Sequence, residues 1–267
     1  MEFTDKVVLI TGGSKGIGRE AAKLFASKGA IVIITGRRED ALQMTSDLIN
    51  EQFGRCEYHQ GDVTSITDCE RIVADVYNRH KRIDVLINNA GMSMRGLFEE
   101  TALALFHKVI AINFSGAVNM TKFALPYLKE HQGSVVFVSS LSGLKGIPGI
   151  APYGTAKMAL TGFSESLRAE VHQYHVHVGL VFVGFTQNDD DKTIYSATGE
   201  RLPIHRAKND ATQEGVSRSI LRCVHRRKAV MYLTVLGKVS KLLYQFFPRF
   251  SSYLLRKFTM NSEMMQT

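Results

Sequence analysis

The sequence predicts an α/β fold in which helices cover both faces of a parallel sheet of about seven strands, giving three layers. Two observations carry this prediction. Short apolar runs rich in Val and Ile alternate with longer segments whose apolar residues follow the helical period. The chain has 267 residues, 45% of them hydrophobic, which is enough for one domain with a core that is stable on its own.

The elements follow from these patterns in chain order. Gly16–Ser27 is expected to form the first helix, with Ile17, Ala21, Leu24 and Phe25 on one face. Further helices are expected to connect the later strands. The strands are predicted at residues 6–11, 30–35, 57–61, 85–88, 134–139, 177–183 and 229–234.

A single catalytic domain is expected over residues 1–235, followed by an extension over residues 236–267. Within the domain, residues 184–212 are polar and predict a long loop that acts as a lid. The formal net charge is +8, but residues 215–262 hold ten Lys and Arg and no acid. Removing those ten from 33 leaves 23 basic residues against 25 acidic ones, so the basicity belongs to the C-terminal part.

A glycine-rich turn, T-G-G-S-K-G-I-G, joins the first strand to the first helix. Gly12, Gly16 and Gly18 permit a tight turn and let a pyrophosphate approach the backbone closely. The helix amino terminus offers free N–H groups to the anion. A glycine-rich turn also serves ordinary loops, but its position between strand and helix favours a dinucleotide site.

The spacing of these glycines resembles that of the short-chain dehydrogenase/reductase family, whose members have a Rossmann-like doubly wound sheet, and the resemblance extends over about residues 6–183. It implies a nicotinamide cofactor held by residues that follow successive strands. The Asn88 to Gly91 run matches the family's N-N-A-G motif, although an Asn pair at a strand end is also common in turns. The implied cofactor-binding residues are Gly12, Ser14, Lys15, Gly16, Ile17, Gly18, Asp62, Val63, Asn89, Ala90, Gly91, Tyr153, Lys157, Gly184 and Thr186.

The residues after the second strand predict NADP(H) rather than NAD. NAD-binding proteins place an acid there to accept a hydrogen bond from the ribose 2′-OH. Here the sequence reads Gly36-Arg37-Arg38, and a guanidinium suits the 2′-phosphate of NADP. Lys15 adds a second cation. The alternative is that these cations are ordinary solvated surface residues.

Tyr153 and Lys157 are predicted to carry the chemistry of carbonyl reduction. Their i, i+4 spacing puts them on one face of a helix, where the ammonium lowers the phenol pKa from its free value of about 10. Tyr153 can then protonate a developing alkoxide. The resemblance implies that Lys157 also binds the nicotinamide ribose, that Ser140 hydrogen-bonds the substrate oxygen and that Asn113 helps hold a relay water.

The Tyr-x-x-x-Lys spacing is not specific, because it recurs at Tyr77 and at Tyr253. Ser240 even precedes Tyr253 by the same 13 residues that separate Ser140 from Tyr153. Only Ser140 closes a predicted strand on the ligand side of the sheet, so the other two sets are interpreted as structural. Ser139 is the less favoured hydroxyl, since successive strand residues face opposite sides.

The sequence departs from the family pattern after the sixth strand. Family members usually have Pro-Gly there, with a Thr four residues beyond the Gly. This chain has Val183-Gly184-Phe185-Thr186-Gln187-Asn188, so Asn188 stands at the Thr position. The lost Pro should make this turn less rigid, at the place where Phe185, Thr186 and Asn188 would contact the nicotinamide carboxamide.

No metal site and no membrane-spanning stretch are expected. The three cysteines and the nine histidines lack metal-ligand spacing. Free thiols, and polar residues directly before the first strand in place of a signal peptide, favour the cytoplasm. No apolar run reaches the roughly 18 residues that a membrane span needs.

Residues 236–267 are predicted to form a basic, amphipathic helical extension, with a second helix starting at Pro248. Two interpretations stay open: peripheral contact with an anionic membrane, or packing on the domain or on a second copy. Family members with such tails handle hydrophobic substrates, which implies a steroid, retinoid, sphingoid or fatty carbonyl. The resemblance also implies a homodimer or homotetramer.

Two other function classes would use some of the same features. A non-catalytic NADP-sensing protein would keep the turn and Arg37, yet it would not need Ser140, Tyr153 and Lys157. A nucleic-acid binder could use the basic extension, but its cations are interleaved with apolar residues rather than gathered on one polar face. The sequence therefore favours a reductase, with no nucleic-acid partner.

Overall fold

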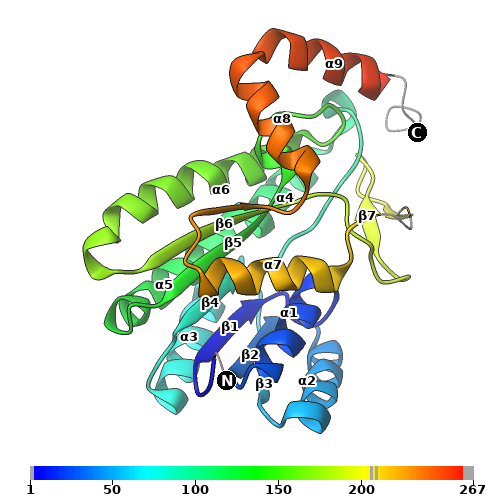
Figure 1. Cartoon of the computed structure of the whole chain (residues 1–267). Coiled ribbons are helices and arrows are strands. Elements are labelled where there is room, and N and C mark those ends of the chain that lie inside the picture. The colour runs from blue at the N-terminus through cyan, green and yellow to red at the C-terminus, as the bar shows by residue number, and fades with distance from the viewer. Residues whose placement is uncertain (1–2, 205–206, 208–209, 261–267) are drawn as a thin grey trace.

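The computed structural model describes residues 3–204, 207 and 210–260, and it confirms the α/β fold (Figure 1). The main sheet has seven parallel strands, and the predicted bounds agree to within one residue except at the carboxyl end of the last strand. The strands are β1 Val7–Thr11, β2 Ile31–Gly36, β3 Cys56–Gln60, β4 Val85–Asn88, β5 Ser134–Ser140, β6 His177–Val183 and β9 Val230–Tyr232.

The strand order β3-β2-β1-β4-β5-β6-β9 fixes where a ligand can bind. From β1 the chain adds β2 and then β3 on one side of the sheet. β4 then pairs with the other side of β1, with Val8 opposite Val85. The connections that follow β1 and β4 therefore leave the sheet toward opposite faces, which opens a crevice at their carboxyl ends. The glycine-rich turn and the N-N-A-G run lie at this crevice.

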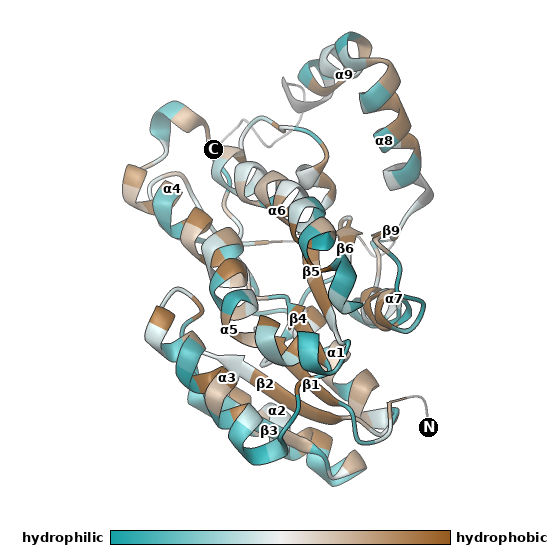
Figure 2. Ribbon diagram, turned by 90° about the vertical axis from the view of Figure 1, so that its left-hand side faces the viewer, coloured by the Kyte–Doolittle hydropathy of each residue, from teal (hydrophilic) through white to brown (hydrophobic). Residues whose placement is uncertain are grey.

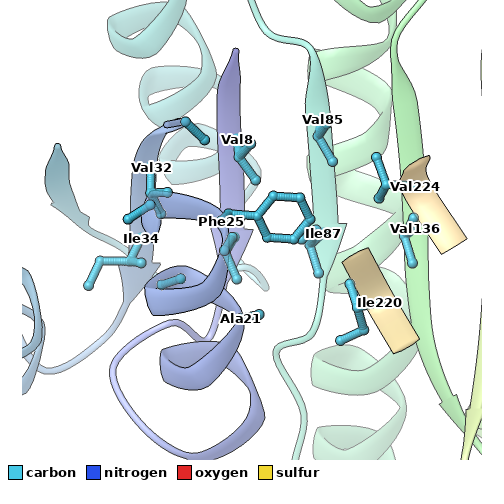
Figure 3. Close-up of a cluster of buried hydrophobic side chains, with 14 of the residues drawn as sticks. Val8, Ala21, Phe25, Val32, Ile34, Val85, Ile87, Val136, Ile220 and Val224 are labelled. Carbon is cyan, nitrogen blue, oxygen red and sulfur yellow. The ribbon is translucent and has the colours of Figure 1, made fainter. Parts of the chain in front are cut away.

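One face of the sheet is covered by α1 Gly16–Ser27, α2 Glu39–Phe53 and α7 Gln213–His225. Figure 3 shows Phe25 of α1 directed at Val8 and Ile87 of the strands, with Ile220 of α7 beside it. These side chains are fully buried. Their packing holds the amino terminus of α1 rigidly at the end of β1.

The other face is covered by α3 Ile66–His80, α5 Gly116–Glu130 and α6 Ala151–Glu170. α4 Leu103–Ile110 continues into α5 through a π-helical turn, η2 Ala111–Ser115. Three short 3₁₀ turns complete this half of the domain, at η1 Phe98–Glu100, η3 Leu141–Gly143 and η4 His172–Tyr174. Because both faces of the sheet are covered, the central strands β1, β2, β4, β5 and β6 are mainly apolar rather than alternating, whereas the edge strand β3, C-E-Y-H-Q, is largely polar and only partly buried.

One helix differs from the sequence expectation about membrane spans. By length and composition alone, the continuous helix Leu103–Glu130 is apolar enough to cross a membrane. Its apolar character has a structural explanation, because Met120, Ala124 and Leu128 are fully buried in the core against the sheet. A helix that packs on a sheet meets the same hydropathy criterion as a membrane span.

The loop predicted over residues 184–212 is not entirely irregular in its described part. β7 Thr193–Tyr195 and β8 Arg201–Pro203 pair as an antiparallel hairpin. The turn between them closes through hydrogen bonds from the Ser196 N–H to the Glu200 carbonyl, 2.8 Å, and from the Glu200 N–H to Ser196 Oγ, 3.0 Å. Strands of three residues are too short to show a periodic pattern in sequence. Residues 205, 206, 208 and 209 lie outside the described residues.

The C-terminal extension forms two helices, α8 Val235–Phe246 and α9 Pro248–Met260, with the predicted start at Pro248. Residues 261–267 of the predicted extension lie outside the described residues. α8 and α9 stand apart from the sheet and its covering helices (Figures 1 and 2). Lys145 ties them to the domain by donating to Ser251 Oγ, 2.9 Å, and to the Pro248 carbonyl, 3.2 Å. The large apolar side chains of the predicted stripe that are exposed are Val239, Leu242, Phe246, Phe247, Phe250 and Tyr253.

Candidate active site

The glycine-rich turn has the geometry of a phosphate-binding cradle. A Cβ on Gly18 would lie 2.2 Å from the Gly12 carbonyl oxygen, so α1 can approach the turn only with Gly there. Gly12 and Gly16 have positive φ, +66° and +58°, which other residues rarely adopt. Lys15, the N-cap of α1, makes no side-chain cap hydrogen bond. The first-turn N–H groups of α1 are therefore not capped from their own N-cap.

The ends of β1 and β4 are tied together beside this turn. Asn89 donates from Nδ2 to the carbonyls of Thr11, 3.0 Å, and Gly12, 3.1 Å. Thr11 Oγ1 accepts from the N–H groups of Asn89 and Ala90, both at 3.0 Å. Ala90 also touches Gly12, where a Cβ would come within 2.9 Å of the Ala90 Cα. The predicted Asn89, Ala90 and Gly12 are thus brought together.

The predicted 2′-phosphate residues lie at the neighbouring strand ends. Arg37 is 60% exposed, and its guanidinium lies 4.0 Å from the Asp62 carboxylate. Arg38 is the N-cap of α2 and is exposed. Lys15 and Arg38 both lower the pKa of Asp191, with the hydrogen bond from Lys15 as the larger cause. These positions suit a 2′-phosphate, while the exposure of Arg37 also fits a solvated surface cation.

Asp62 and Val63, which the family resemblance implies bind the cofactor, are fixed by local hydrogen bonds and packing. Asp62 Oδ1 accepts from the Thr64 N–H and from its hydroxyl, both at 2.9 Å. The Val63 carbonyl accepts from Asn119 Nδ2 at 3.0 Å. Gly116 leaves room for Val63, since a Cβ at Gly116 would lie 2.5 Å from Val63 Cγ2. Ser14 and Ile17, also predicted, lie in the turn itself, where Ser14 accepts from Thr45 Oγ1 at 2.9 Å and Ile17 packs on the core.

Lys157 and Tyr153 lie together on the first turns of α6. The Lys157 side chain is almost completely buried and donates from Nζ to the Val138 carbonyl at 2.9 Å. Burial lowers its pKa from 10.5 to about 8. Nζ lies 5.6 Å from the centre of the Tyr153 ring. The structure therefore brings an ammonium to the phenol, as the helical spacing predicts.

The two neighbouring serines at the end of β5 face different surroundings. Ser139 is buried and donates to the Lys157 carbonyl at 3.3 Å, which leaves its hydroxyl occupied within the fold. Ser140 is partly exposed, donates to Ser142 Oγ at 3.3 Å and accepts from the Ser142 N–H at 3.2 Å. Ser140 is thus the hydroxyl of the pair that solvent or a ligand can reach.

Asn113 sits in the π-helical turn η2. Its Nδ2 donates to the carbonyls of Met92 and Val109, both at 2.9 Å, and its side chain is buried. Its Oδ1 is buried and has no hydrogen-bond partner among the described residues. Gly91 lies against this oxygen, since a Cβ there would come within 2.7 Å. Single π-helical turns are frequent at functional sites.

The turn after β6, where the sequence departs from the family pattern, is bonded to the start of α7. The Phe185 carbonyl accepts from the Ala211 N–H at 3.1 Å, and the Gln187 N–H donates to the Ala211 carbonyl at 2.9 Å. Thr186 donates to the Gly184 carbonyl at 3.2 Å, and Asn188 donates to the Ile204 carbonyl at 3.2 Å. These polar groups already have hydrogen-bond partners within the chain. Their roles toward a cofactor stay predictions.

Sequence reasoning missed two sets of residues at the site. Met92, Met94 and Tyr195 pack around Tyr153 in a small apolar cluster with Leu105 and Val109. Asp189 and Asp191 contact the glycine-rich turn and Lys15. The run of three Asp residues was the available signal for the second set, but nothing in the sequence indicates which turn they face. The first set joins segments that lie up to 103 residues apart, from Met92 to Tyr195.

The described residues fit a nicotinamide dinucleotide in two respects. The cradle at Gly12 and Gly18 leaves bare backbone for a pyrophosphate. Asn89 and Gly91 lie between this cradle and Asn113, which is on the same side as the α6 pair.

No group of three His, Cys, Asp or Glu side chains that could hold a metal ion occurs within the described part of the chain.

Comparison with known proteins agrees with this geometry. Residues 6–198 match the family model described as short chain dehydrogenase. The chain belongs to the short-chain dehydrogenase family. The matched segment runs from the start of β1 to the β7–β8 hairpin, so it contains every predicted catalytic residue.

Two relatives and one solved structure illustrate the similarity. An uncharacterized oxidoreductase of Thermotoga maritima is 39% identical over 190 residues, which cover 71% of this chain and 75% of that protein. The 11-beta-hydroxysteroid dehydrogenase-like 4A protein of Arabidopsis thaliana is 38% identical over 186 residues, covering 68% of this chain and 62% of that relative, less than two thirds of its length. A short-chain dehydrogenase from Streptomyces avermitilis superposes with a TM-score of 0.82 at 27% identity, over 97% of this chain and 98% of its own.

Proposed function

We propose that this protein is an oxidoreductase that uses NADPH to reduce a ketone or aldehyde. The observation that carries the proposal is the pair on α6, in which the buried Lys157 ammonium lies 5.6 Å from the Tyr153 ring centre at the carboxyl end of the sheet. With a pKa of about 8, Lys157 is mostly protonated at neutral pH. A fixed positive charge beside a phenol favours release of the phenol proton.

The reaction needs a hydride at the carbonyl carbon and a proton at the carbonyl oxygen. NADPH, if held at the glycine-rich turn and beside the α6 pair, would supply the hydride and be oxidised to NADP⁺. Tyr153 donates its proton to the oxygen, so that the alcohol forms, and Lys157 stabilises the phenolate that remains. Ser140, the accessible hydroxyl at the end of β5, donates a hydrogen bond to the same oxygen. Asn113 and Lys157 position a relay water, through which solvent returns a proton to Tyr153.

The preference for NADPH over NADH rests on the cations around the second strand. Lys15, Arg37 and Arg38 lie at the two strand ends that an adenosine ribose would approach, and no acid follows Gly36 directly. A guanidinium can pair with a 2′-phosphate through two hydrogen bonds, whereas a ribose hydroxyl needs an acceptor. Arg37 carries this preference because its forked head is exposed, and its ion pair with Asp62, at 4.0 Å, leaves further N–H donors for a phosphate.

The substrate we propose is lipophilic. The immediate neighbours of Tyr153 are the apolar cluster of Met92, Met94, Leu105, Val109 and Tyr195. A hydrocarbon skeleton can bury against thioethers and an aromatic ring while its carbonyl points at the phenol. The names of the Arabidopsis relatives, which refer to hydroxysteroid dehydrogenases, are in line with this class, within which a steroid, retinoid, sphingoid or fatty carbonyl would fit.

The test is NADPH oxidation, followed by absorbance, against a panel of short polar and long apolar ketones and aldehydes. We expect turnover with NADPH, faster for apolar carbonyls, and much slower turnover with NADH. Arg37→Asp should reverse the preference between the cofactors, whereas Arg226→Asp, at the opposite end of α7 from the site, should not. Binding of NADPH without turnover of any carbonyl would support a non-catalytic NADP-sensing protein instead.

We also propose that α8 and α9 contact an anionic membrane surface. Six large apolar side chains of these helices are exposed, among them Phe246, Phe247 and Phe250, and Lys238, Lys241, Arg249, Arg256 and Lys257 lie between them. Apolar burial and attraction to anionic headgroups then act together. Such contact would deliver a lipophilic substrate from the membrane to the active site. The compartment we propose is the reducing cytoplasm, which the buried free thiols of Cys56, Cys69 and Cys223 fit.

The membrane contact is tested by co-sedimentation with vesicles containing about one third anionic lipid. The triple variant Phe246→Ser, Phe247→Ser, Phe250→Ser should lose binding, whereas Met44→Ser, which removes a still more exposed apolar residue from α2, should retain it. Light scattering on the same variants measures the oligomeric state, which we propose to be a homodimer or homotetramer. If the triple variant binds vesicles normally but dissociates to monomers, the apolar face is a contact between copies.

A further inference from the structure

The acidic run at residues 189–191 lies against the glycine-rich turn, although the two segments are far apart in the sequence. It follows β6 in the chain, yet two of its carboxylates contact residues at the start of α1. Each of these contacts joins segments more than 165 residues apart. The fold, not the local chain, therefore brings the carboxylates to this turn.

Asp189 makes the contacts that a phosphate would make at the same place. Its Oδ2 accepts from the Gly16 N–H at 3.1 Å, and its Oδ1 accepts from the Arg19 guanidinium at 2.9 Å. Gln213 at the start of α7 adds a hydrogen bond to Oδ1 at 3.2 Å. The Gly16 N–H is the first of the α1 helix, where the positive end of the helix dipole favours an anion.

Asp191 pairs with a cation that the proposed function assigns to the 2′-phosphate. It forms an ion pair with Lys15, and the charge of Arg38 acts on it as well. The hydrogen bond from Lys15 lowers the pKa of Asp191, so this carboxylate is ionised at neutral pH. Asp190, between the two, has no ion pair or side-chain hydrogen bond to the turn within the described residues, which makes it an internal control.

We propose that Asp189 and Asp191 occupy the two phosphate positions of the cofactor site when no dinucleotide is bound, and that they compete with it. The inference rests on the proposed function, because the ligand displaced is the dinucleotide. Asp189 stands where the pyrophosphate binds, and Asp191 neutralises the cation that holds the 2′-phosphate. A carboxylate and a phosphate cannot share the Gly16 N–H, so the acidic run must leave before the pyrophosphate can enter.

The competition sets both affinity and selectivity. The measured dissociation constant rises in inverse proportion to the fraction of molecules whose site is open, so closure in about nine molecules of ten weakens binding about tenfold. The pyrophosphate is common to NADP⁺ and NAD⁺, so Asp189 lowers the affinity for both. The 2′-phosphate is present only in NADP⁺, so Asp191 lowers the affinity for NADP⁺ more than for NAD⁺.

The experiment is titration calorimetry of NADP⁺ and NAD⁺ against the full chain and the variants Asp189→Asn, Asp191→Asn and Asp190→Asn. Each variant removes one negative charge from the same segment, so a general charge effect would appear equally in all three. We expect Asp189→Asn to tighten both dinucleotides by about three- to tenfold. Asp191→Asn should tighten NADP⁺ more than NAD⁺, and Asp190→Asn should change either by less than about twofold.

A second measurement examines the contact without any cofactor. Hydrogen exchange of the peptide that contains the Gly16 amide should be faster in Asp189→Asn than in the wild type, and unchanged in Asp190→Asn. Equal exchange in all three proteins, or weaker dinucleotide binding by Asp189→Asn, would overturn the competition.

The two proposals fail in different ways. A wild type that prefers NAD⁺ would contradict the proposed NADPH preference, yet the Asp189 effect would still be measured with NAD⁺. Binding that is identical in the wild type and Asp189→Asn overturns the competition alone. Binding of neither dinucleotide by any of the four proteins overturns both.

Discussion

Two regions of this molecule carry the same three residues at the same spacing and place them in opposite surroundings. In each region a Ser is followed after 13 residues by a Tyr, and after four more by a Lys. The first region is the end of β5 with α6, and the second is α8 with α9. The residues are Ser140, Tyr153 and Lys157 in the first region and Ser240, Tyr253 and Lys257 in the second.

In the first region the sheet and its helices bury Lys157 and partly cover Tyr153. Lys157 is 5% exposed, bonded to the Val138 carbonyl, and close to a Tyr153 ring that packs in an apolar cluster. In the second region the Tyr253 side chain is 55% exposed and Lys257 is exposed as well. A charge in water is screened, while a charge held in the protein interior acts strongly on its neighbour. Helical spacing sets which residues are neighbours, and burial sets whether one changes the chemistry of the other.

A third pair with the same spacing, Tyr77 and Lys81, supports this explanation. Tyr77 donates to the Glu130 carboxylate at 3.2 Å and stacks on Tyr127, with ring centres 3.9 Å apart. Its surroundings raise the phenol pKa, with desolvation and the Glu130 hydrogen bond as the main causes. Lys81 is the exposed C-cap of α3 and does not offset this. A carboxylate partner thus makes Tyr77 a poorer proton donor.

The largest difference between the two regions is expected for the tyrosines. Tyr153→Phe removes the proton donor while keeping the ring, and loss of a general acid costs about 10²- to 10⁴-fold in turnover. NADPH binding should persist, which fluorescence titration of the cofactor measures. Tyr253→Phe should keep kcat within about twofold. Comparable loss of turnover in both variants would mean that burial does not distinguish the regions.

A smaller but still large effect is expected for the serines. Ser140→Ala removes a hydrogen-bond donor to the reacting oxygen, and loss of one such donor costs about 10²- to 10³-fold in kcat. Ser139→Ala and Ser240→Ala are the matched controls, because Ser139 is bonded to the Lys157 carbonyl and Ser240 lies on α8. Steady-state kinetics on the three variants is the measurement. A larger loss for Ser139→Ala than for Ser140→Ala would exchange their roles.

The smallest predicted effect concerns the pH dependence of stability in the cofactor-free protein. The pKa of Lys157 is about 8 in the fold and 10.5 when unperturbed, so the unfolded chain holds the proton more tightly. The free energy of unfolding therefore rises with pH between about 8 and 10.5, by at most about 3 kcal/mol, relative to Lys157→Met. Below pH 8 both states are protonated and the difference is constant.

Lys257→Met provides the control for that measurement, since Lys257 is exposed. Urea unfolding of the wild type and both variants at pH 7, 8, 9 and 10 gives the comparison. The wild-type curve should run parallel to that of Lys257→Met and diverge from that of Lys157→Met. A constant difference between wild type and Lys157→Met across this range would contradict a lowered Lys157 pKa.

Most of the sheet was predictable because its residues obey local rules. The strands β1 and β4 to β6 each contain a run of apolar residues, since parallel strands are covered on both faces, and the glycines of the first turn mark the junction with α1. The start of α9 followed from Pro248, which fits the first turn of a helix. The β7–β8 hairpin escaped prediction because strands of three residues are too short to show a detectable alternation.

The sequence by itself determined the architecture, the glycine-rich turn and which residues share a helix face, because these depend on contacts between near neighbours in the chain. Only the tertiary structure decided that, among the lysines of the three Tyr-x-x-x-Lys pairs, Lys157 is the buried one. It also decided that Asn113 keeps an oxygen beside Gly91 that has no partner among the described residues, and that Asp189 faces the Gly16 N–H. The physical reason is that desolvation and ion pairing depend on groups from distant segments of the chain, and no local sequence pattern predicts which of these groups come into contact.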